Sequence, residues 1–314
     1  MYQQIIKLPF FKTKNDFVVY LNEYKYLSLK GVQLNSDLRD QILFNEGILI
    51  QKRIIKKNTE ILERILVIEP HLDDFALSAS SYALNAMPCG ASITVLNIFS
   101  KTSVTNFPWR QKITISNKQY EKLRIQESLI AVEQYLGEKF ESFRLSSPTL
   151  SGHIETYQEK YNQDELINNL TKRLIKKIRK EKISTVLCPM AVRYHVDHSI
   201  TFEAVLKTYK LLKQSFKLII YEDMPYARDK TAYFSRLKQI KKNITTEDIY
   251  ISNEEYLEII ADLIIIYRSQ FDDVNRQQML AIIKEDFRAT SSNKRADSKK
   301  MEFSQHYFKV KSLK

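Results

Sequence analysis

The sequence predicts an α/β protein with a mostly parallel sheet flanked by helices, in a single enlarged domain. Three observations lead to this prediction. Short runs rich in Ile, Val and Leu recur at 65–68, 92–98, 185–189 and 216–221, which is typical of strands buried on both faces. Helical patterns separate these runs. Two of the runs are followed by clusters of histidine and aspartate, at the strand ends where open α/β sheets bind ligands.

The length of 314 residues is enough to bury a large core. We expect residues 1–60 to form an N-terminal extension packed on the main domain. The main domain is expected at 61–285, and a polar loop and C-terminal tail at 286–314. Within the extension, 17–21 and 47–50 are each compatible with a short strand.

Two segments show the periodicity of amphipathic helices. In the first, apolar residues share one face at Ile125, Leu129, Val132 and Leu136. Gly137 follows where a C-terminal cap belongs. In the second, apolar residues repeat every four positions at Leu166, Leu170, Leu174 and Ile178. We expect this second helix to carry a basic outer face.

Three segments lack regular patterns. The loop at 101–117 contains the only tryptophan, Trp109, which either contacts substrate above the site or anchors the loop to the core. Residues 288–300 are polar and charged, so we expect a mobile surface loop. Residues 301–310 return either as a final strand or as a docked tail. His153 lies in a Ser-Gly-His loop and His306 in the C-terminal tail, and we expect both at the surface.

The net charge of +12 is spread along the chain in pairs such as Lys172-Arg173. Such pairs are typical of the solvated faces of helices, and no nucleic-acid-binding motif accompanies them, so we expect no nucleic-acid partner. Two other interpretations stay open. In the first, the positive charge attracts an anionic substrate, for example a nucleotide-linked or lipid-linked sugar. In the second, the surface makes a peripheral contact with an anionic membrane.

Several classes of protein are excluded by what the sequence lacks. The five glycines are isolated, so there is no glycine-rich phosphate or dinucleotide loop, and there is no Cys-x-x-Cys pair. Cys89 and Cys188 are predicted to be small buried hydrophobic residues in a reducing compartment. The N-terminus lacks a secretory signal pattern, and the longest apolar run is too short to span a bilayer. We therefore expect a cytoplasmic protein.

The strongest functional signal is a pair of clusters that contain three of the five histidines. Pro70-His71-Leu72-Asp73-Asp74 follows one predicted strand, and His195-Val196-Asp197-His198 follows another. His71, Asp74 and His198 form a set of two imidazoles and a carboxylate that can hold a divalent ion and leave positions open for water and substrate. Such an ion activates its bound water and polarises a carbonyl group.

The remaining residues of the two clusters have the chemistry that amide hydrolysis needs. Asp73 is adjacent to a predicted ligand and free to act as general base. His195 is a candidate for hydrogen bonding to the developing oxyanion or the leaving amine. Asp197 is expected to orient one imidazole through its second ring nitrogen. We count these three residues as catalytic candidates.

Taken in order, these motifs resemble the PIG-L/LmbE-like family of zinc-dependent N-acetylglucosamine de-N-acetylases. The first cluster resembles the family's His-Pro-Asp-Asp-Glu motif, and the second its His-x-Asp-His motif. Arg124-Ile-Gln-Glu127 resembles an Arg-x-x-Glu helix, and Tyr267-Arg268-Ser269-Gln270 is similar to a Tyr-x-Ser-Gln element. The turn 221–226 is found in some members. The resemblance covers about 64–271.

The resemblance implies a Rossmann-like fold and a hydrolase that removes acetyl groups from amino sugars. It implies His71, Asp74 and His198 as zinc ligands, Asp73 as base and His195 as the partner of the tetrahedral intermediate. Arg124 is implied as a substrate-binding residue, although an ion pair on the helix surface with Glu121 or Glu127 is an alternative. We add Arg193 as a second substrate-binding candidate.

The chain departs from the family pattern at Leu72, where proline is usual, and at Phe75, where glutamate is usual. These changes alter the pocket wall and favour a substrate other than a simple N-acetylglucosamine conjugate. Two alternative functions remain: a metallo-amidase on a non-sugar N-acyl substrate, and a non-catalytic sugar-binding protein. The ligand set also accommodates Fe²⁺ or Mn²⁺.

Overall fold

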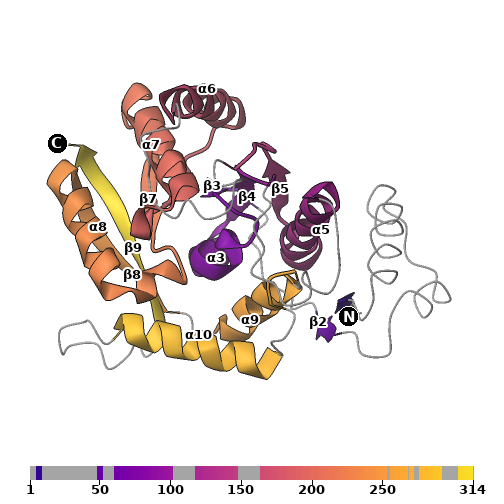
Figure 1. Cartoon of the computed structure of the whole chain (residues 1–314). Coiled ribbons are helices and arrows are strands. Elements are labelled where there is room, and N and C mark those ends of the chain that lie inside the picture. Colours follow the sequence, from indigo (N-terminus) through magenta and orange to yellow (C-terminus); the bar gives the residue numbers. More distant parts are fainter. Residues whose placement is uncertain are drawn as a thin grey trace.

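The computed structural model describes residues 5–8, 48–51, 60–101, 117–147, 163–252, 255–267, 269–271, 276–291 and 303–313. Strand alternates with helix through most of this chain (Figure 1). A seven-stranded mixed sheet has the order β5-β4-β3-β6-β7-β9-β8. Its strands are β3 (Glu63–Glu69), β4 (Ala91–Asn97), β5 (Lys139–Ser142), β6 (Thr185–Pro189), β7 (Lys217–Tyr221), β8 (Ile244–Ser252) and β9 (Ser304–Leu313).

The five strands from β3 to β7 are parallel, and β9 runs antiparallel between β7 and β8. The predicted α/β fold with a mostly parallel sheet is confirmed. The apolar runs correspond to β3, β4, β6 and β7 within a residue or two. Strands β5 and β8 were not predicted, because β5 is four residues long and β8 is polar and half-exposed, so neither forms an apolar run.

Helices cover both faces of the sheet. On one face lie η1 (Phe75–Ala79), α3 (Ser80–Ala86), η2 (Met87–Cys89), α5 (Asn117–Leu129), η3 (Ile130–Leu136), α9 (Leu257–Ile266) and α10 (Arg276–Ser291). On the other lie α6 (Gln163–Glu181), α7 (Val196–Leu211) and α8 (Lys230–Asn243). Short helical turns η5 (Val192–Tyr194) and η6 (Tyr226–Arg228) follow β6 and β7.

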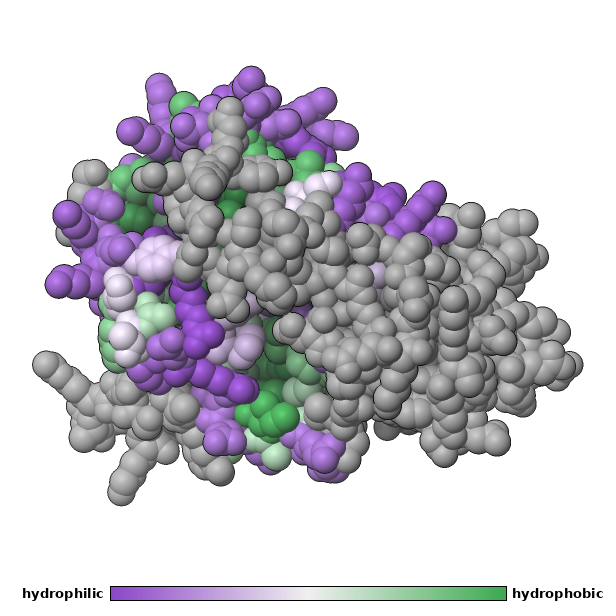
Figure 2. All heavy atoms as spheres, viewed as in Figure 1, coloured by the Kyte–Doolittle hydropathy of each residue, from purple (hydrophilic) through white to green (hydrophobic). Residues whose placement is uncertain are grey.

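The alternation of side chains along β3 divides the core in two. Ile65 and Val67 pack with α3, η3, α9 and α10, whereas Leu66 and Ile68 pack with α6, α7 and α8. All four are fully buried. The strand is therefore apolar on both faces, which is why it forms a continuous run in the sequence. Hydrophilic side chains crowd the outer surface near α6 and α7, as the periodicity predicts (Figure 2).

The two predicted helices are confirmed. The first spans α5 and continues into η3, and it ends at Gly137, which has a φ of 68° and caps the helix in the left-handed conformation. The second is α6. Among the residues that the structure describes, no helix is long and apolar enough to cross a membrane.

The C-terminal segment is a full strand of the sheet. β9 pairs with β7 on one side and β8 on the other. Of the two alternatives for this segment, the strand is therefore correct. Helix α10 runs through Ser291, so the expected loop at 288–300 begins as helix, and the remainder of that loop lies outside the described residues.

A separate antiparallel pair is formed by β1 (Ile5–Leu8) and β2 (Ile48–Gln51). β2 matches the strand considered at 47–50. The strand considered at 17–21, the substrate loop at 102–116 with Trp109, and His153 lie outside the described residues. The division of the chain at 60 and 285 stays a prediction.

Candidate metal centre

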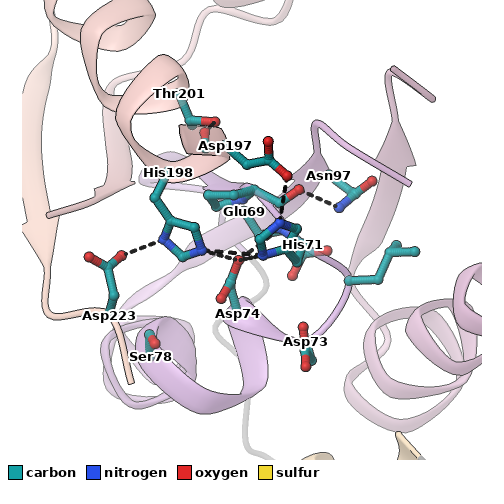
Figure 3. Close-up of polar contacts among 12 residues, drawn as sticks. Glu69, His71, Asp73, Asp74, Ser78, Asn97, Asp197, His198, Thr201 and Asp223 are labelled. Atoms are coloured by element: carbon teal, nitrogen blue, oxygen red, sulfur yellow. Dashed lines mark hydrogen bonds and ion pairs between the residues drawn. The ribbon is translucent and has the colours of Figure 1, made fainter. Parts of the chain in front are cut away.

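The order of the sheet brings three strand ends to one place. β3 is flanked by β4 and β6, so the chain leaves β3 toward one side and returns on the other, which is the switch point where open α/β sheets form their sites. His71 follows β3, His195 and His198 follow β6, and Asp223 follows β7. Figure 3 shows the side chains of His71, Asp74, His198 and Asp223 gathered there.

The three predicted ligands place one atom each in a tight triangle. Nε2 of His198 lies 3.3 Å from Nδ1 of His71. Oδ2 of Asp74 lies 3.6 Å from the same His71 nitrogen and 3.4 Å from Nε2 of His198. Atoms bound at about 2.0–2.2 Å around a tetrahedral ion are about 3.4 Å apart, so this triangle has the size that a metal requires.

His195 is a second candidate for the third position. One ring nitrogen from each of His71, His195 and His198 lies within 4.8 Å of the other two. Asp74 offers the shorter separations. The ring of His195 lies edge-on to both neighbouring imidazoles, with centroid separations of 5.0 Å to His71 and 5.3 Å to His198. The two candidate sets therefore share His71 and His198.

Each central imidazole is held from behind by a carboxylate. Nε2 of His71 lies 2.9 Å from Oδ2 of Asp197, and Nδ1 of His198 lies 2.9 Å from Oδ1 of Asp223. Each contact leaves the opposite ring nitrogen facing the centre of the triangle (Figure 3). A carboxylate behind a metal-binding histidine fixes the tautomer and ring orientation that coordination needs.

Both supporting carboxylates are tied to further groups. Ser147 donates its hydroxyl to Oδ2 of Asp197 at 2.5 Å, and the backbone N–H of Val192 donates to Oδ2 of Asp223 at 2.7 Å. Asp197, His198 and Asp223 are buried. The positions of both imidazoles are thereby fixed before any ligand binds.

The charges around the triangle favour a cation. Burial opposes a positive charge on His198, but Asp74 and Asp223 outweigh it and raise its pKa to about 9. Burial also raises the pKa of Asp74, against the effect of His198 and His71. Two imidazole nitrogens and one carboxylate oxygen suit Zn²⁺, and also Fe²⁺ or Mn²⁺. The residues present therefore fit a divalent ion.

The peptide before His195 is conformationally strained. Ala191, Arg193 and Tyr194 adopt left-handed φ values of 62°, 59° and 55°, which non-glycine residues rarely do.

The imidazole of His195 is held in its neutral form. Burial is the main cause that lowers its pKa to about 3, and the nearby imidazoles of His71 and His198 lower it further. Its Nδ1 is buried without a hydrogen-bond partner. The ring of Tyr226 lies beside His195, with centroids 5.8 Å apart.

Asp73 is held by Arg124 beside the triangle. A guanidinium nitrogen of Arg124 donates to Oδ1 of Asp73 at 2.8 Å. The alternative for Arg124 was an ion pair on the helix surface with Glu121 or Glu127. Arg124 is only 4% exposed, so it does not lie on the surface. That alternative is wrong. Asp73 lies next to Asp74 without a polar contact to the ligand triangle (Figure 3).

Two motifs of the predicted family meet behind Arg124. Ser269 donates its backbone N–H at 2.6 Å and its hydroxyl at 2.5 Å to the two carboxylate oxygens of Glu127. Gln270 donates to the hydroxyl of Tyr120 at 2.5 Å. The Arg-x-x-Glu helix and the Tyr-x-Ser-Gln element thus form one buried cluster. Burial raises the pKa of Glu127 to about 8.

Arg193 stands at the surface beside the site. It forms an ion pair with Asp229, with nitrogen–oxygen distances of 3.1 and 3.0 Å, and its side chain is 55% exposed. The pair links the loop after β6 to the start of α8. Its role in substrate binding stays a prediction.

Sequence reasoning missed Asp223, Ser147 and Tyr226 as members of this neighbourhood. Asp223 lies two residues after the end of a predicted strand, and that position was the available signal. The surface position expected for His306 is wrong. His306 is buried on β9, with Nδ1 2.8 Å from Glu222 and Nε2 3.2 Å from Asp248. Those partners are distant in sequence, so inspection of neighbouring residues could not find them.

The fold and this arrangement define a class: α/β proteins with a histidine-carboxylate centre at the switch point of the sheet. Residues 66–209 match the family model of GlcNAc-PI de-N-acetylases, PIG-L. This match is to the same family that the sequence motifs resemble. The segment contains every predicted site residue, whereas Asp223 lies beyond it. None of the curated proteins matches the chain in sequence.

Solved structures share the fold. A teicoplanin deacetylase in a zinc-inhibited form is 16% identical with a TM-score of 0.60, covering 80% of this chain and 98% of its own. An N,N'-diacetylchitobiose deacetylase from Pyrococcus horikoshii is 14% identical with a TM-score of 0.54, covering 90% and 94%. A 4-carboxy-2-hydroxymuconate hydratase from Pseudomonas putida KT2440 is 13% identical with a TM-score of 0.55, covering 81% and 98%. The Rossmann-like fold is therefore confirmed. Because a hydratase shares it, the fold does not determine the reaction.

Proposed function

We propose that this protein is a metal-dependent hydrolase that removes an N-acetyl or other N-acyl group from an amino sugar or glycoconjugate. The triangle of His71, Asp74 and His198 carries this proposal, because its three atoms lie 3.3–3.6 Å apart. The match of residues 66–209 to the PIG-L family model and the fold shared with two deacetylases support the same reaction.

His71, Asp74 and His198 would hold the metal, with Zn²⁺ as the first candidate. When bound, a divalent ion lowers the pKa of water and polarises an acyl carbonyl. Asp197 and Asp223 keep Nδ1 of His71 and Nε2 of His198 directed to the centre through the 2.9 Å contacts behind each ring. The same three residues leave open positions for water and substrate.

Asp73 and His195 then divide the proton transfers and the stabilisation of charge. Asp73 takes a proton from the attacking water as general base, and Arg124 holds its carboxylate in place through a 2.8 Å hydrogen bond. His195 offers an N–H to the developing oxyanion, or to the leaving nitrogen, from a ring edge-on to both ligand histidines. Amide hydrolysis requires these two functions together.

The substrate is proposed to be a small or conjugated amino sugar. Tyr226 supplies an aromatic ring beside His195 and His198, with centroids 5.8 and 5.6 Å away. Arg193, which is exposed and lies two residues before His195, is proposed to contact a polar or anionic part of the substrate. A location in the cytoplasm is part of the same proposal.

The test measures metal and acetate on the same samples. Wild type, Asp74→Ala and Asp73→Asn are purified, their metal is quantified by elemental analysis, and acetate release from N-acetylglucosamine conjugates is assayed. We expect about one zinc per chain in wild type and in Asp73→Asn. We expect loss of metal only in Asp74→Ala, and loss of acetate release in both variants.

The outcomes separate the candidate functions. Metal without acetate release points to another N-acyl substrate, including a non-sugar amide, which a panel of N-acyl amines identifies. No metal in wild type, and none taken up when zinc is added, rejects the hydrolase. Sugar binding without metal or turnover supports a non-catalytic sugar-binding protein.

A further inference from the structure

The helical segment η1 follows the turn that contains His71 and Asp74. The residue directly before it does not cap it. Asp74 stands at the N-cap position of η1, yet its side chain makes no capping hydrogen bond. Its Oδ2 instead accepts the backbone N–H of His71 at 2.7 Å and faces the two ligand imidazoles. The residue that normally satisfies the first N–H groups of a helix is thus directed away from them.

Glu69 supplies the missing acceptor from the end of β3. Its Oε2 accepts the backbone N–H of Phe75, the first residue of η1, at 3.0 Å. The side chain of Phe75 has no polar group and is fully buried in the apolar core, so it cannot help to cap the segment. Glu69 and His71 are two residues apart and both are drawn at the end of β3 in Figure 3.

Capping the helix in this way destabilises the folded protein more than an ordinary N-cap would. Glu69 is fully buried, and its second oxygen, Oε1, has no hydrogen-bond partner. A buried unsatisfied oxygen destabilises a folded protein. A short side chain such as Ser or Asn normally caps a helix without that cost, but the residue in position to do so is Asp74. A carboxylate reaching back from the preceding strand leaves Asp74 available for the centre.

We propose that Glu69 is a positioning residue that caps the helical segment so that Asp74 stays directed toward the metal. The inference rests on the proposed function, because it assumes that Asp74 is a ligand. Without Glu69, the first N–H groups of η1 have one acceptor fewer, and Asp74 at the N-cap position is the residue whose carboxylate can turn to them. That rotation removes one of the three ligand atoms.

The test compares Glu69→Leu, which removes the acceptor, with Glu69→Gln, which keeps an oxygen that can accept from Phe75. Ser80→Ala is the matched control, because Ser80 is buried at the start of α3, directly after η1, and its hydroxyl donates to the Ala76 carbonyl at 2.8 Å. The readouts are zinc affinity by competition with a chelator, the visible spectrum of the Co²⁺-loaded protein, and the thermal midpoint of the metal-free protein.

We expect Glu69→Leu to weaken zinc binding by about tenfold or more and to change the Co²⁺ spectrum, which reports the loss of a carboxylate ligand. Glu69→Gln should restore both. Ser80→Ala should leave both unchanged, whatever its thermal midpoint. The proposal is overturned if Glu69→Leu binds zinc like wild type, or if Ser80→Ala weakens zinc binding equally at the same loss of stability.

Failure of this inference is distinguishable from failure of the proposed function. Zinc binding without acetate release counts against the deacetylase, whereas the affinity of Glu69→Leu still decides the role of Glu69. Zinc binding that survives in Asp74→Ala shows that Asp74 is not a ligand and overturns the role of Glu69. A wild-type protein that takes up no zinc overturns both.

Discussion

The carboxylate of Asp223 joins the loop after β6 to the imidazole of His198. Its Oδ1 lies 2.9 Å from Nδ1 of His198, and its Oδ2 accepts the Val192 N–H at 2.7 Å. Since a carboxylate only accepts, the proton of a neutral His198 sits on Nδ1 and the lone pair on Nε2 faces the ligand triangle. Asp223 therefore determines which His198 nitrogen is available to a metal.

Asp223→Asn tests this relationship. If the asparagine oxygen keeps the Val192 hydrogen bond, its NH₂ group faces Nδ1 and favours the tautomer with the proton on Nε2. We expect zinc affinity to fall by about 10–100-fold, as for other groups behind metal ligands. Chelator competition measures it. Asp248→Asn is the control, because Asp248 contacts His306 and not a predicted ligand. Equal zinc affinity in wild type and Asp223→Asn would contradict the tautomer argument.

The sequence predicted the core of the sheet and the ligand triangle for one physical reason. Strands buried on both faces are apolar at every position, so they are visible as runs, and polar residues that follow them directly share one edge of the sheet. His71, Asp74 and His198 follow such runs and are adjacent in space. Local sequence was therefore sufficient for them.

The residues that were missed or misplaced depend on contacts between distant segments. His306 is 84 residues from Glu222 and 58 from Asp248. Glu69 is different from His306, because its partner Phe75 is close in sequence. Its proposed role depends on the direction of the Asp74 side chain, which only the structure shows. Strand β8 escaped detection because only one of its residues is fully buried.

Arg124 is expected to act through Asp73. Its guanidinium donates to Oδ1 of Asp73 at 2.8 Å, and its side chain is 5% exposed. In Arg124→Gln, Asp73, which we propose as the base, loses its fixed position, so we expect kcat to fall by about 10²-fold with KM little changed. Steady-state kinetics on the substrate identified by acetate release measures both constants. A raised KM with unchanged kcat would show that Arg124 binds substrate directly.

Glu127 makes the free energy of unfolding depend on pH. Burial raises its pKa from the ordinary value of 4.5 to about 8 in the folded protein. Between these values the folded state holds a proton that the unfolded state has released, so stability falls as pH rises, by at most about 1.4 kcal/mol per pH unit. Below 4.5 this loss is absent, and above 8 it is complete.

Glu127→Gln removes that titration and keeps an oxygen that can accept from Ser269. We expect the stability of the variant relative to wild type to increase steadily from about pH 5 to about pH 8. Urea unfolding at three pH values across this window measures the difference. A difference that stays constant with pH would show that Glu127 is ionised in the folded protein throughout.

Arg236 is expected to hold the strained loop that presents His195. Its Nε donates to the Met190 carbonyl at 2.8 Å, and its guanidinium lies 4.5 Å from the ring centre of Phe202 and 5.5 Å from that of Tyr194. Arg236→Met keeps most of the apolar stem but leaves that carbonyl without this donor, so we expect a loss of about 1–3 kcal/mol in the free energy of unfolding. The left-handed residues at 191, 193 and 194 would then relax. We expect this change to displace His195 and to lower kcat. We expect zinc to stay bound, because the proposed ligands His71, Asp74 and His198 are unchanged. Urea unfolding, zinc content and kcat measured on one preparation check the three effects. Lost stability with unchanged kcat would show that the loop keeps its conformation without Arg236.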